Sequence, residues 1–252
     1  MNSKISSLKS WDDRRDLAIP GDHDATVRFC IEHIISVYKQ AVADHGYFTL
    51  VLSGGSTPKE LYEILCTPPY KEAINWSKVF LFWGDERPVP PNDPKSNYHM
   101  AMEAGFKHLP IPSQQILRMH AEEKIEENAI AYEKKIREIL KNHSFDLIIL
   151  GCGEDGHTAS LFPHTKALKI KDRLVAANDV PQLQTQRMTL TYPCINAASN
   201  SIIYVLGDSK KDIVAKVLTS PDQFEIYPIQ AIGTNEHKAL WILDQAAAEL
   251  LY

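Results

Sequence analysis

The sequence of 252 residues has little cysteine and no long hydrophobic run. Its four cysteines, Cys30, Cys66, Cys152 and Cys194, are scattered and form no CxxC pair. This argues against a disulfide framework and a thiolate zinc site, and is typical of reduced cytoplasmic thiols. No apolar run reaches membrane-spanning length, and the N-terminal segment MNSKISSLKSWDDRR lacks a signal-peptide core. We therefore expect a cytoplasmic protein without a membrane-spanning segment.

An excess of positive charge is also missing. The 27 Lys and Arg residues are outnumbered by 32 Asp and Glu residues, which gives a formal net charge of −5 at pH 7. No cluster of Lys and Arg stands without acidic residues nearby, so the electrostatic footprint of a nucleic-acid or anionic-membrane binder is absent. The expected partner is a small molecule or another protein, and the chain is expected to be a monomer or a small homo-oligomer.

The sequence does contain an alternation of strand and helix patterns. Apolar residues recur at helical spacing over 27–42 and 125–140. Five short runs are apolar at consecutive positions, as in strands buried on both faces: FTLVL (48–52), VFLFW (79–83), DLIIL (146–150), SIIYVL (201–206) and ALWIL (239–243). We predict an α/β fold with a mostly parallel sheet flanked by helices on both faces. Residues 1–252 are expected to form a single domain, and a small inserted lobe is an open alternative.

Ligands of open parallel sheets bind beyond the carboxyl ends of the strands, so the loops there are the first places to look for a site. The loop after the 48–52 strand reads SGGST. Thr57 and Glu60 match a T-x-x-E capping box, which predicts a helix whose first residue is Pro58.

Two glycines precede this predicted helix. Backbone N–H groups there can approach an anion closely, and the helix dipole favours negative charge. Gly54, Gly55 and Ser56 are therefore candidate phosphate ligands. A tight turn that only joins strand to helix is the alternative. The loop is not a Walker A motif, because it lacks the G-K-[ST] ending.

The loop after the 79–83 strand begins with a charged cluster, Asp85, Glu86 and Arg87, followed by the proline-rich segment 88–94. Such clusters are usually solvated. Because the preceding strand is predicted to be buried, Arg87 is a candidate for an inward-facing, bidentate phosphate ligand.

The loop after the 146–150 strand, GCGEDGHTASLFPH, places three glycines close to Asp155 and His157. A histidine in this position is a good candidate for a general base, since its pKa lies near working pH. A metal site of Asp155, His157 and His164 is an alternative with less support, because no further ligand cluster accompanies them. Cys152 as a nucleophile has less support still, because nothing indicates an activated thiolate.

Two further cations lie at the ends of predicted strands, one at the start of a strand and one just after a strand. Arg187 begins the strand-like segment RMTLTYP, and Lys210 lies at the start of a helix-patterned stretch after SIIYVL. Either could be a surface cation. Together with Arg87 they are candidates for a dianionic phosphate site, which needs several donors.

In chain order, the motifs are SGGSTP, GDERxVPxxxxxSNY, DLxxLGxGxDGHxASLFP, RxTLTxP, a GxxK helix start and LWxLD. Together they resemble the 6-phosphogluconolactonase family, a match that spans roughly residues 48 to 244. The most specific part is DGHxASLFP.

The resemblance implies hydrolysis of 6-phospho-D-glucono-1,5-lactone to 6-phosphogluconate in the oxidative pentose phosphate pathway, without a metal or organic cofactor. It also implies the fold of sugar-phosphate isomerases and deaminases. His157 would be the general base, and Asp155 would either orient it or point away from the ring. The implied phosphate ligands are Gly54, Gly55, Ser56, Arg87, Arg187 and Lys210.

The sequence departs from the family pattern at one place. Members often carry an additional arginine after TLTxP, where this chain reads CINAAS (194–199). This departure concerns substrate affinity rather than the type of reaction.

Two rival functions remain. A deaminase or isomerase of the same superfamily would use Asp85 as base, but deaminases resemble DGHxAFNEP and this chain has Phe162 at the glutamate position. A non-catalytic sugar-phosphate sensor would need a helix-turn-helix module, and too few residues precede the first predicted helix.

Overall fold

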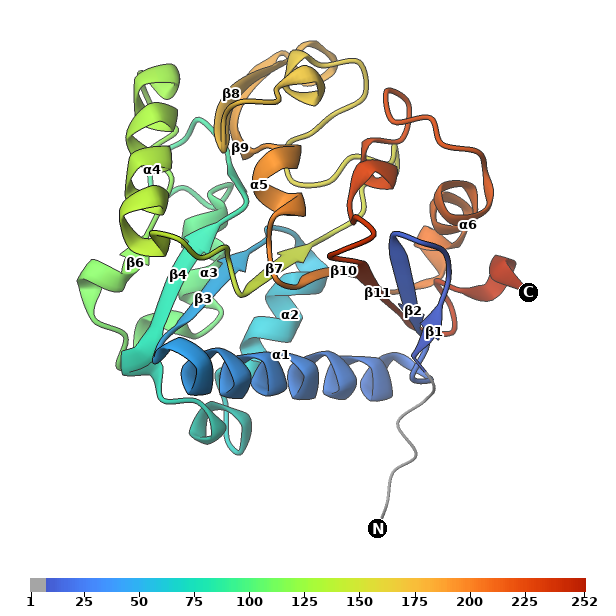
Figure 1. Ribbon diagram of the computed structural model, residues 1–252, viewed down its shortest axis with the longest axis horizontal. Helices are drawn as coiled ribbons and strands as arrows, with labels where there is room; N and C mark the ends of the chain where they lie inside the picture. The colour runs from blue at the N-terminus through green and yellow to red at the C-terminus, as the bar shows by residue number, and fades with distance from the viewer. Residues whose placement is uncertain (1–7) are drawn as a thin grey trace.

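A central sheet of eight strands organises the computed structural model, which describes residues 8–252 (Figure 1). The strand order is β1-β2-β11-β10-β7-β3-β4-β6, and every neighbouring pair is parallel except β1–β2. The strands are β1 (Lys9–Ser10), β2 (Arg15–Ala18), β3 (Phe48–Leu52), β4 (Val79–Trp83), β6 (Ile116–Leu117), β7 (Leu147–Leu150), β10 (Ser201–Val205) and β11 (Ala239–Leu243). The predicted parallel sheet is confirmed, and all five predicted strands are found within one residue of their expected bounds.

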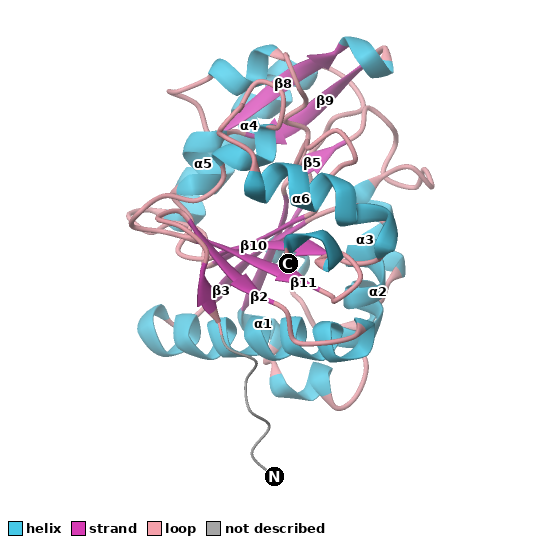
Figure 2. Cartoon of the chain, turned by 90° about the vertical axis from the view of Figure 1, so that its right-hand side faces the viewer, coloured by secondary structure: helices cyan, strands magenta, loops and turns pink. Residues whose placement is uncertain are grey.

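Helices cover both faces of this sheet, as predicted. Figures 1 and 2 both show α1 along one face and α5 on the opposite side. The helices are α1 (His23–His45), α2 (Ser56–Leu65), α3 (Asn97–Glu103), α4 (Ile125–Leu140), α5 (Tyr192–Asn196) and α6 (Lys211–Thr219). The predicted helices at 27–42 and 125–140 correspond to α1 and α4.

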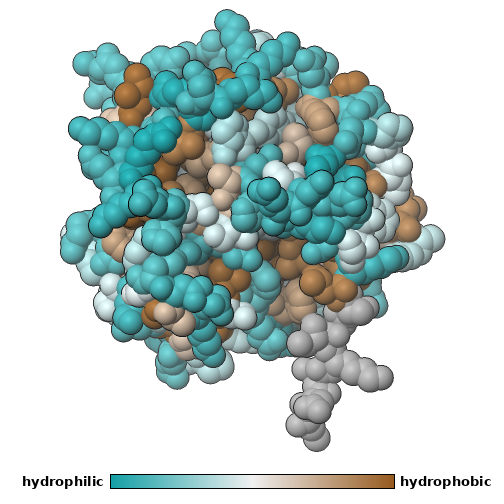
Figure 3. Space-filling model, viewed as in Figure 1, coloured by the Kyte–Doolittle hydropathy of each residue, from teal (hydrophilic) through white to brown (hydrophobic). Residues whose placement is uncertain are grey.

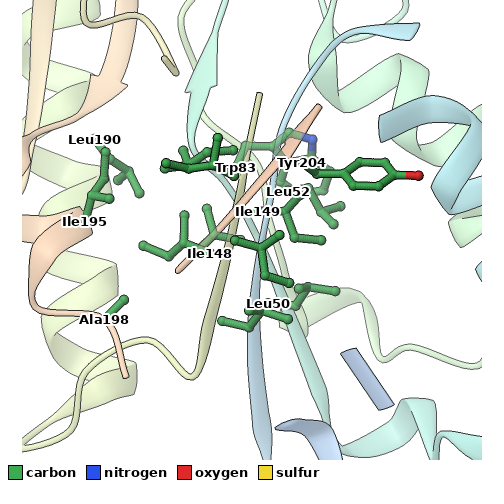
Figure 4. Packing of buried hydrophobic residues seen from close by; sticks show 14 of the residues in the cluster. Leu50, Leu52, Trp83, Ile148, Ile149, Leu190, Ile195, Ala198 and Tyr204 are labelled. Atoms are coloured by element: carbon green, nitrogen blue, oxygen red, sulfur yellow. The ribbon is translucent and has the colours of Figure 1, made fainter. Parts of the chain in front are cut away.

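The core lies where the central strands meet these helices. Every residue of β3 and of β7 is buried, which explains why both segments are apolar at consecutive positions. Figure 4 shows Ile148 and Ile149 of β7 beside Leu50 of β3, with Ile195 of α5 on one side and Tyr204 of β10 on the other. This packing fixes the strand ends from which the loops of the site emerge.

A second, antiparallel sheet stands beyond the ends of the parallel strands. It has the order β5-β9-β8 and consists of β5 (Asp85–Glu86), β9 (Thr185–Leu190) and β8 (Val175–Val180). Only Gly84 separates β5 from β4, and its backbone oxygen accepts a hydrogen bond from Leu190 N at 2.8 Å. The chain therefore passes directly from the parallel sheet into the smaller one, which carries Arg187 over the strand ends.

The start of α2 corrects one prediction. The helix begins at Ser56 with Gly55 as N-cap, and no side chain caps it, so Thr57 and Glu60 form no capping box. The φ of Gly55 is 110°, a conformation that glycine adopts readily. The chain therefore turns into the helix at Ser56, before it reaches Thr57. Pro58 is accommodated because N–H groups of the first helical turn have no intrahelical acceptor.

Across residues 8–252, no helix combines the length and apolar composition needed to span a membrane. The face in Figure 3 is mostly hydrophilic, with smaller hydrophobic areas between.

Candidate active site

A cavity of about 620 Å³ opens at the carboxyl ends of the parallel strands. Its lining comes from the loops after β3, β4 and β7, from β9 and from the turn before α6. Of the residues predicted for the site, the cavity lining includes Gly54, Gly55, Arg87, Asp155, His157, Arg187 and Lys210. Ser56, at the first turn of α2, lies next to the lining but not in it. Segments that are more than 150 residues apart in the chain thus meet at one place.

The side chains of His157 and Asp155 form a close pair. His157 Nδ1 lies 2.5 Å from Asp155 Oδ1, which also accepts a hydrogen bond from the backbone N–H of His157 at 3.1 Å. An ionised carboxylate can only accept, so Nδ1 carries the proton and Nε2 of the neutral ring is left as the basic nitrogen. Of the two orientations predicted for Asp155, the structure has the one that faces the ring.

Burial and hydrogen bonding act in opposite directions on this carboxylate. Burial alone would raise the pKa of Asp155, but the hydrogen bonds from the side chain and backbone of His157, together with the charge that its ring carries when protonated, lower it below the ordinary value. Asp155 therefore stays ionised, and able to hold Nδ1–H, throughout the neutral range.

Two neighbours fix the histidine ring. Phe162 stacks on it with a centroid distance of 4.0 Å and an interplanar angle of 21°. On Gly153, a Cβ would overlap with Nδ1 and Cε1 of His157 and lie 2.8 Å from Asp155 Oδ1. Only glycine at position 153 leaves room for the pair of His157 and Asp155. The sequence did not predict this role, because the loop has three glycines and the local pattern does not indicate which one faces the ring.

Three cations of the cavity have no carboxylate partner. Within the described part of the chain, Arg87, Arg187 and Lys210 form no salt bridge, and the only side-chain hydrogen bond among them joins Arg87 Nη1 to the backbone oxygen of Lys95. Burial, with the nearby charge of Arg87 adding to it, lowers the pKa of Arg187. Like charges held together in a partly buried site favour an anionic ligand.

The glycine loop adds backbone donors. The N–H groups of Gly54, Gly55, Ser56 and Thr57 have no acceptor within residues 8–252. They lie at the N-terminus of α2, where the helix dipole also favours an anion.

Asp85 lines the cavity and is buried. Its Oδ2 accepts a hydrogen bond from Ser160 Oγ at 2.6 Å, and its Oδ1 accepts one from Asn97 Nδ2 at 3.0 Å. Both oxygens are thus engaged. Ser160 and Asn97 were not predicted as functional, although Asn97 belongs to the SNY motif.

The remaining alternatives from the sequence receive no geometric support. Burial raises the pKa of Cys152 to about 12, so it is a thiol at neutral pH. His164 does not line the cavity. No group of three or more His, Cys, Asp or Glu side chains in the described residues is arranged to hold a metal ion.

Known proteins resemble this chain along almost its full length. The family described as glucosamine-6-phosphate isomerases/6-phosphogluconolactonase matches residues 21–241. The 6-phosphogluconolactonase of Chlamydia pneumoniae is 37% identical over 247 residues, covering 98% of this chain and 94% of that protein. The 6-phosphogluconolactonase of Chlamydia muridarum is 40% identical over 241 residues, covering 95% and 91%.

Solved structures agree. The structure of 6-phosphogluconolactonase from Thermotoga maritima has a TM-score of 0.77 at 27% identity, covering 90% of this chain and 98% of that one. A structure described as a monomeric glucosamine-6-phosphate deaminase has a TM-score of 0.79 at 17% identity, covering 93% and 99%, which shows a shared fold alone. The resemblance read from the motifs is confirmed, and the chain belongs to the family of glucosamine-6-phosphate isomerases and 6-phosphogluconolactonases.

Proposed function

We propose that this protein hydrolyses 6-phospho-D-glucono-1,5-lactone to 6-phosphogluconate, the lactone step of the oxidative pentose phosphate pathway, with His157 as general base. The observation that carries the proposal is the cavity itself, which combines a carboxylate-oriented histidine with three cations that form no salt bridge among residues 8–252. The names of the relatives at 37% and 40% identity support the same reaction. A volume of about 620 Å³ suits a phosphorylated sugar.

The reaction needs one base that later acts as an acid. Nε2 of His157 takes a proton from water as the water oxygen bonds to C1 of the lactone. The electron pair of the C=O bond moves onto the carbonyl oxygen. It then re-forms the C=O bond as the bond between C1 and the ring oxygen breaks. That oxygen leaves with the proton from Nε2, which restores the neutral imidazole. Asp155 holds Nδ1–H throughout, and stabilises the imidazolium that exists between the two transfers.

The phosphate is proposed to be the anchor of the substrate. Arg87, Arg187 and Lys210 would neutralise its two charges, and the N–H groups of the Gly54–Ser56 loop would donate hydrogen bonds. Because the phosphate does not react, its binding energy can be used to place C1 against the attacking water.

A deaminase or isomerase fits the same cavity less well. Such an enzyme would need Asp85 as a base, and both of its oxygens already accept hydrogen bonds from Ser160 and Asn97. In place of a glutamate that could assist ring opening, the apolar ring of Phe162 stacks on His157.

Freshly generated 6-phosphogluconolactone provides the test, by following acid release above the spontaneous rate. His157→Ala should lower kcat by roughly 10²- to 10⁴-fold with little change in KM, as expected for loss of a general base. The matched control is His164→Ala, an exposed histidine of the same loop that lies outside the cavity. A folded wild-type protein that gives no acceleration would refute the reaction, and unchanged turnover in His157→Ala would remove His157 from the mechanism.

A further inference from the structure

A buried asparagine, Asn97, connects two of the segments that line the cavity. It is 1% exposed and is the first residue of α3. Its Nδ2 donates hydrogen bonds to the backbone oxygen of Asp85 at 2.9 Å and to Asp85 Oδ1 at 3.0 Å, and its backbone N–H donates to Glu86 Oε1 at 2.8 Å. Asn97 is thereby fixed to β5, the strand immediately before Arg87.

The same amide packs against the glycine loop. A Cβ on Gly54 would overlap with Oδ1 and Cγ of Asn97 and lie 2.9 Å from its Nδ2, so only glycine allows this approach. Oδ1 of Asn97 is buried and has no hydrogen-bond donor among residues 8–252. A buried acceptor without a donor is costly and calls for an explanation. The oxygen packs against Gly54, where a Cβ would otherwise lie.

The contacts continue from Asp85 to the histidine loop. Asp85 Oδ2 accepts a hydrogen bond from Ser160 Oγ at 2.6 Å, and Ser160 follows His157 by three positions. Ser160 is held in turn, since its backbone oxygen accepts from Asn178 Nδ2 at 2.9 Å. A continuous series of buried contacts therefore joins the glycine loop to the histidine loop: Gly54, Asn97, Asp85 and Ser160.

We infer that Asn97 is a positioning residue that sets the distance between the phosphate at the Gly54 loop and the basic nitrogen of His157. The inference rests on the proposed function, since a phosphate anchor helps only if C1 then reaches the histidine. Asn97 does not line the cavity, and acts by holding Gly54 and Asp85 in register. Misplacing a reacting group by about 1 Å can cost about 10²-fold in rate.

The first test is Asn97→Ala, with kcat and KM measured on 6-phosphogluconolactone. We expect kcat to fall roughly 10- to 100-fold while KM changes less than about threefold, because the cations that bind phosphate remain while the alignment is lost. The matched control is Asn200→Ala. The Asn200 Nδ2 also donates to the backbone oxygen of an aspartate, Asp146, at 2.9 Å. Asp146 comes just before β7, at the end of this strand away from the cavity, so Asn200→Ala should keep the wild-type kcat.

The second test uses the steric contact. Gly54→Ala should lower kcat by about tenfold or more, because its Cβ displaces the Asn97 amide. In an Asn97→Ala background that space is free, so adding Gly54→Ala should cost less than about threefold. Costs that simply multiply in the double variant would overturn the inference.

The outcomes separate the inference from the proposed function. Absence of lactone hydrolysis by the wild type would reject the function, whereas an active wild type with an equally active Asn97→Ala would reject only the role of Asn97. If thermal melting shows that Asn97→Ala does not fold, Ser160→Ala decides, because it breaks the next contact in the series. A similar fall in its kcat supports the inference, and a wild-type kcat overturns it.

Discussion

At the scale of single residues, the histidine loop decides which nitrogen is available for chemistry. Asp155 binds Nδ1–H, Phe162 packs on the face of the ring, and Gly153 leaves the space that His157 and Asp155 need. Each contact restricts the imidazole in a different way, so the ring is held in one orientation at the edge of the cavity. If His157 is the general base, as proposed, its ring is already oriented before the substrate arrives.

Asp155→Asn tests the charge of this pair. At neutral pH, kcat should fall by a factor of up to about 10⁴, since an amide can hold the ring in the wrong tautomer. Steady-state kinetics on the lactone measure this fall, and a wild-type kcat in Asp155→Asn would contradict a role for the carboxylate.

The lowered pKa of Asp155 also makes the free energy of unfolding depend on pH. For a carboxyl group with a lower pKa in the folded than in the unfolded protein, the stabilisation is present above the unfolded pKa and is lost as pH falls through the folded one. The contribution of Asp155 is therefore complete at neutral pH and disappears only in the acid range.

At the scale of elements, the caps determine where the helices begin and end, and so where the neighbouring strands can begin. The N-cap of α1 is Asp22, whose Oδ1 accepts a hydrogen bond from Ala25 N at 2.9 Å. Its C-cap is Gly46, with a φ of 91°, two residues before β3. Helix α2 begins without a side-chain cap, and this leaves its first N–H groups available for a ligand.

Asp22→Ala should therefore destabilise the fold without touching the site. We expect a loss of about 0.5–2 kcal/mol in the free energy of unfolding, which lowers Tm by about 2–4 °C for each kcal/mol. Asp44→Ala, which removes an exposed carboxylate from the last turn of the same helix, is the control and should not lower Tm. Thermal melting and kcat on the lactone check both statements, and an equal loss of Tm in the two variants would count against the cap.

At the scale of the whole molecule, an acidic chain brings three cations into one cavity, whose lining also holds Asp85, Glu154 and Asp155. The formal net charge is −5, yet Arg87, Arg187 and Lys210 meet in one cavity without carboxylate partners among the described residues. Folding thus concentrates cations from three distant segments of an acidic protein, and the cavity should attract an anion.

Inorganic phosphate should consequently raise the Tm of the wild type in a concentration-dependent way, because a ligand that binds only the folded state stabilises it by RT ln(1 + [L]/Kd). Arg187→Ala should lose most of this shift. Arg28→Ala is the matched control, since Arg28 is exposed on α1 and also has no ion-pair partner in residues 8–252. Sodium chloride at equal ionic strength separates specific binding from screening. The same phosphate shift in Arg187→Ala and wild type would remove Arg187 from the phosphate site.

The sequence by itself determined the parallel sheet, because strands buried on both faces must be apolar at consecutive positions, as in FTLVL and LIIL. It also determined which loops to search, since they follow those strands. Tertiary structure decided the rest. Whether Asp155 faces His157, which glycine makes room for the ring, and how Asn97 joins Gly54 to Asp85 depend on contacts between distant segments. Local patterns cannot encode such distances, and at α2 they also misplaced the helix start, because the free φ of Gly55 prevailed over the capping motif.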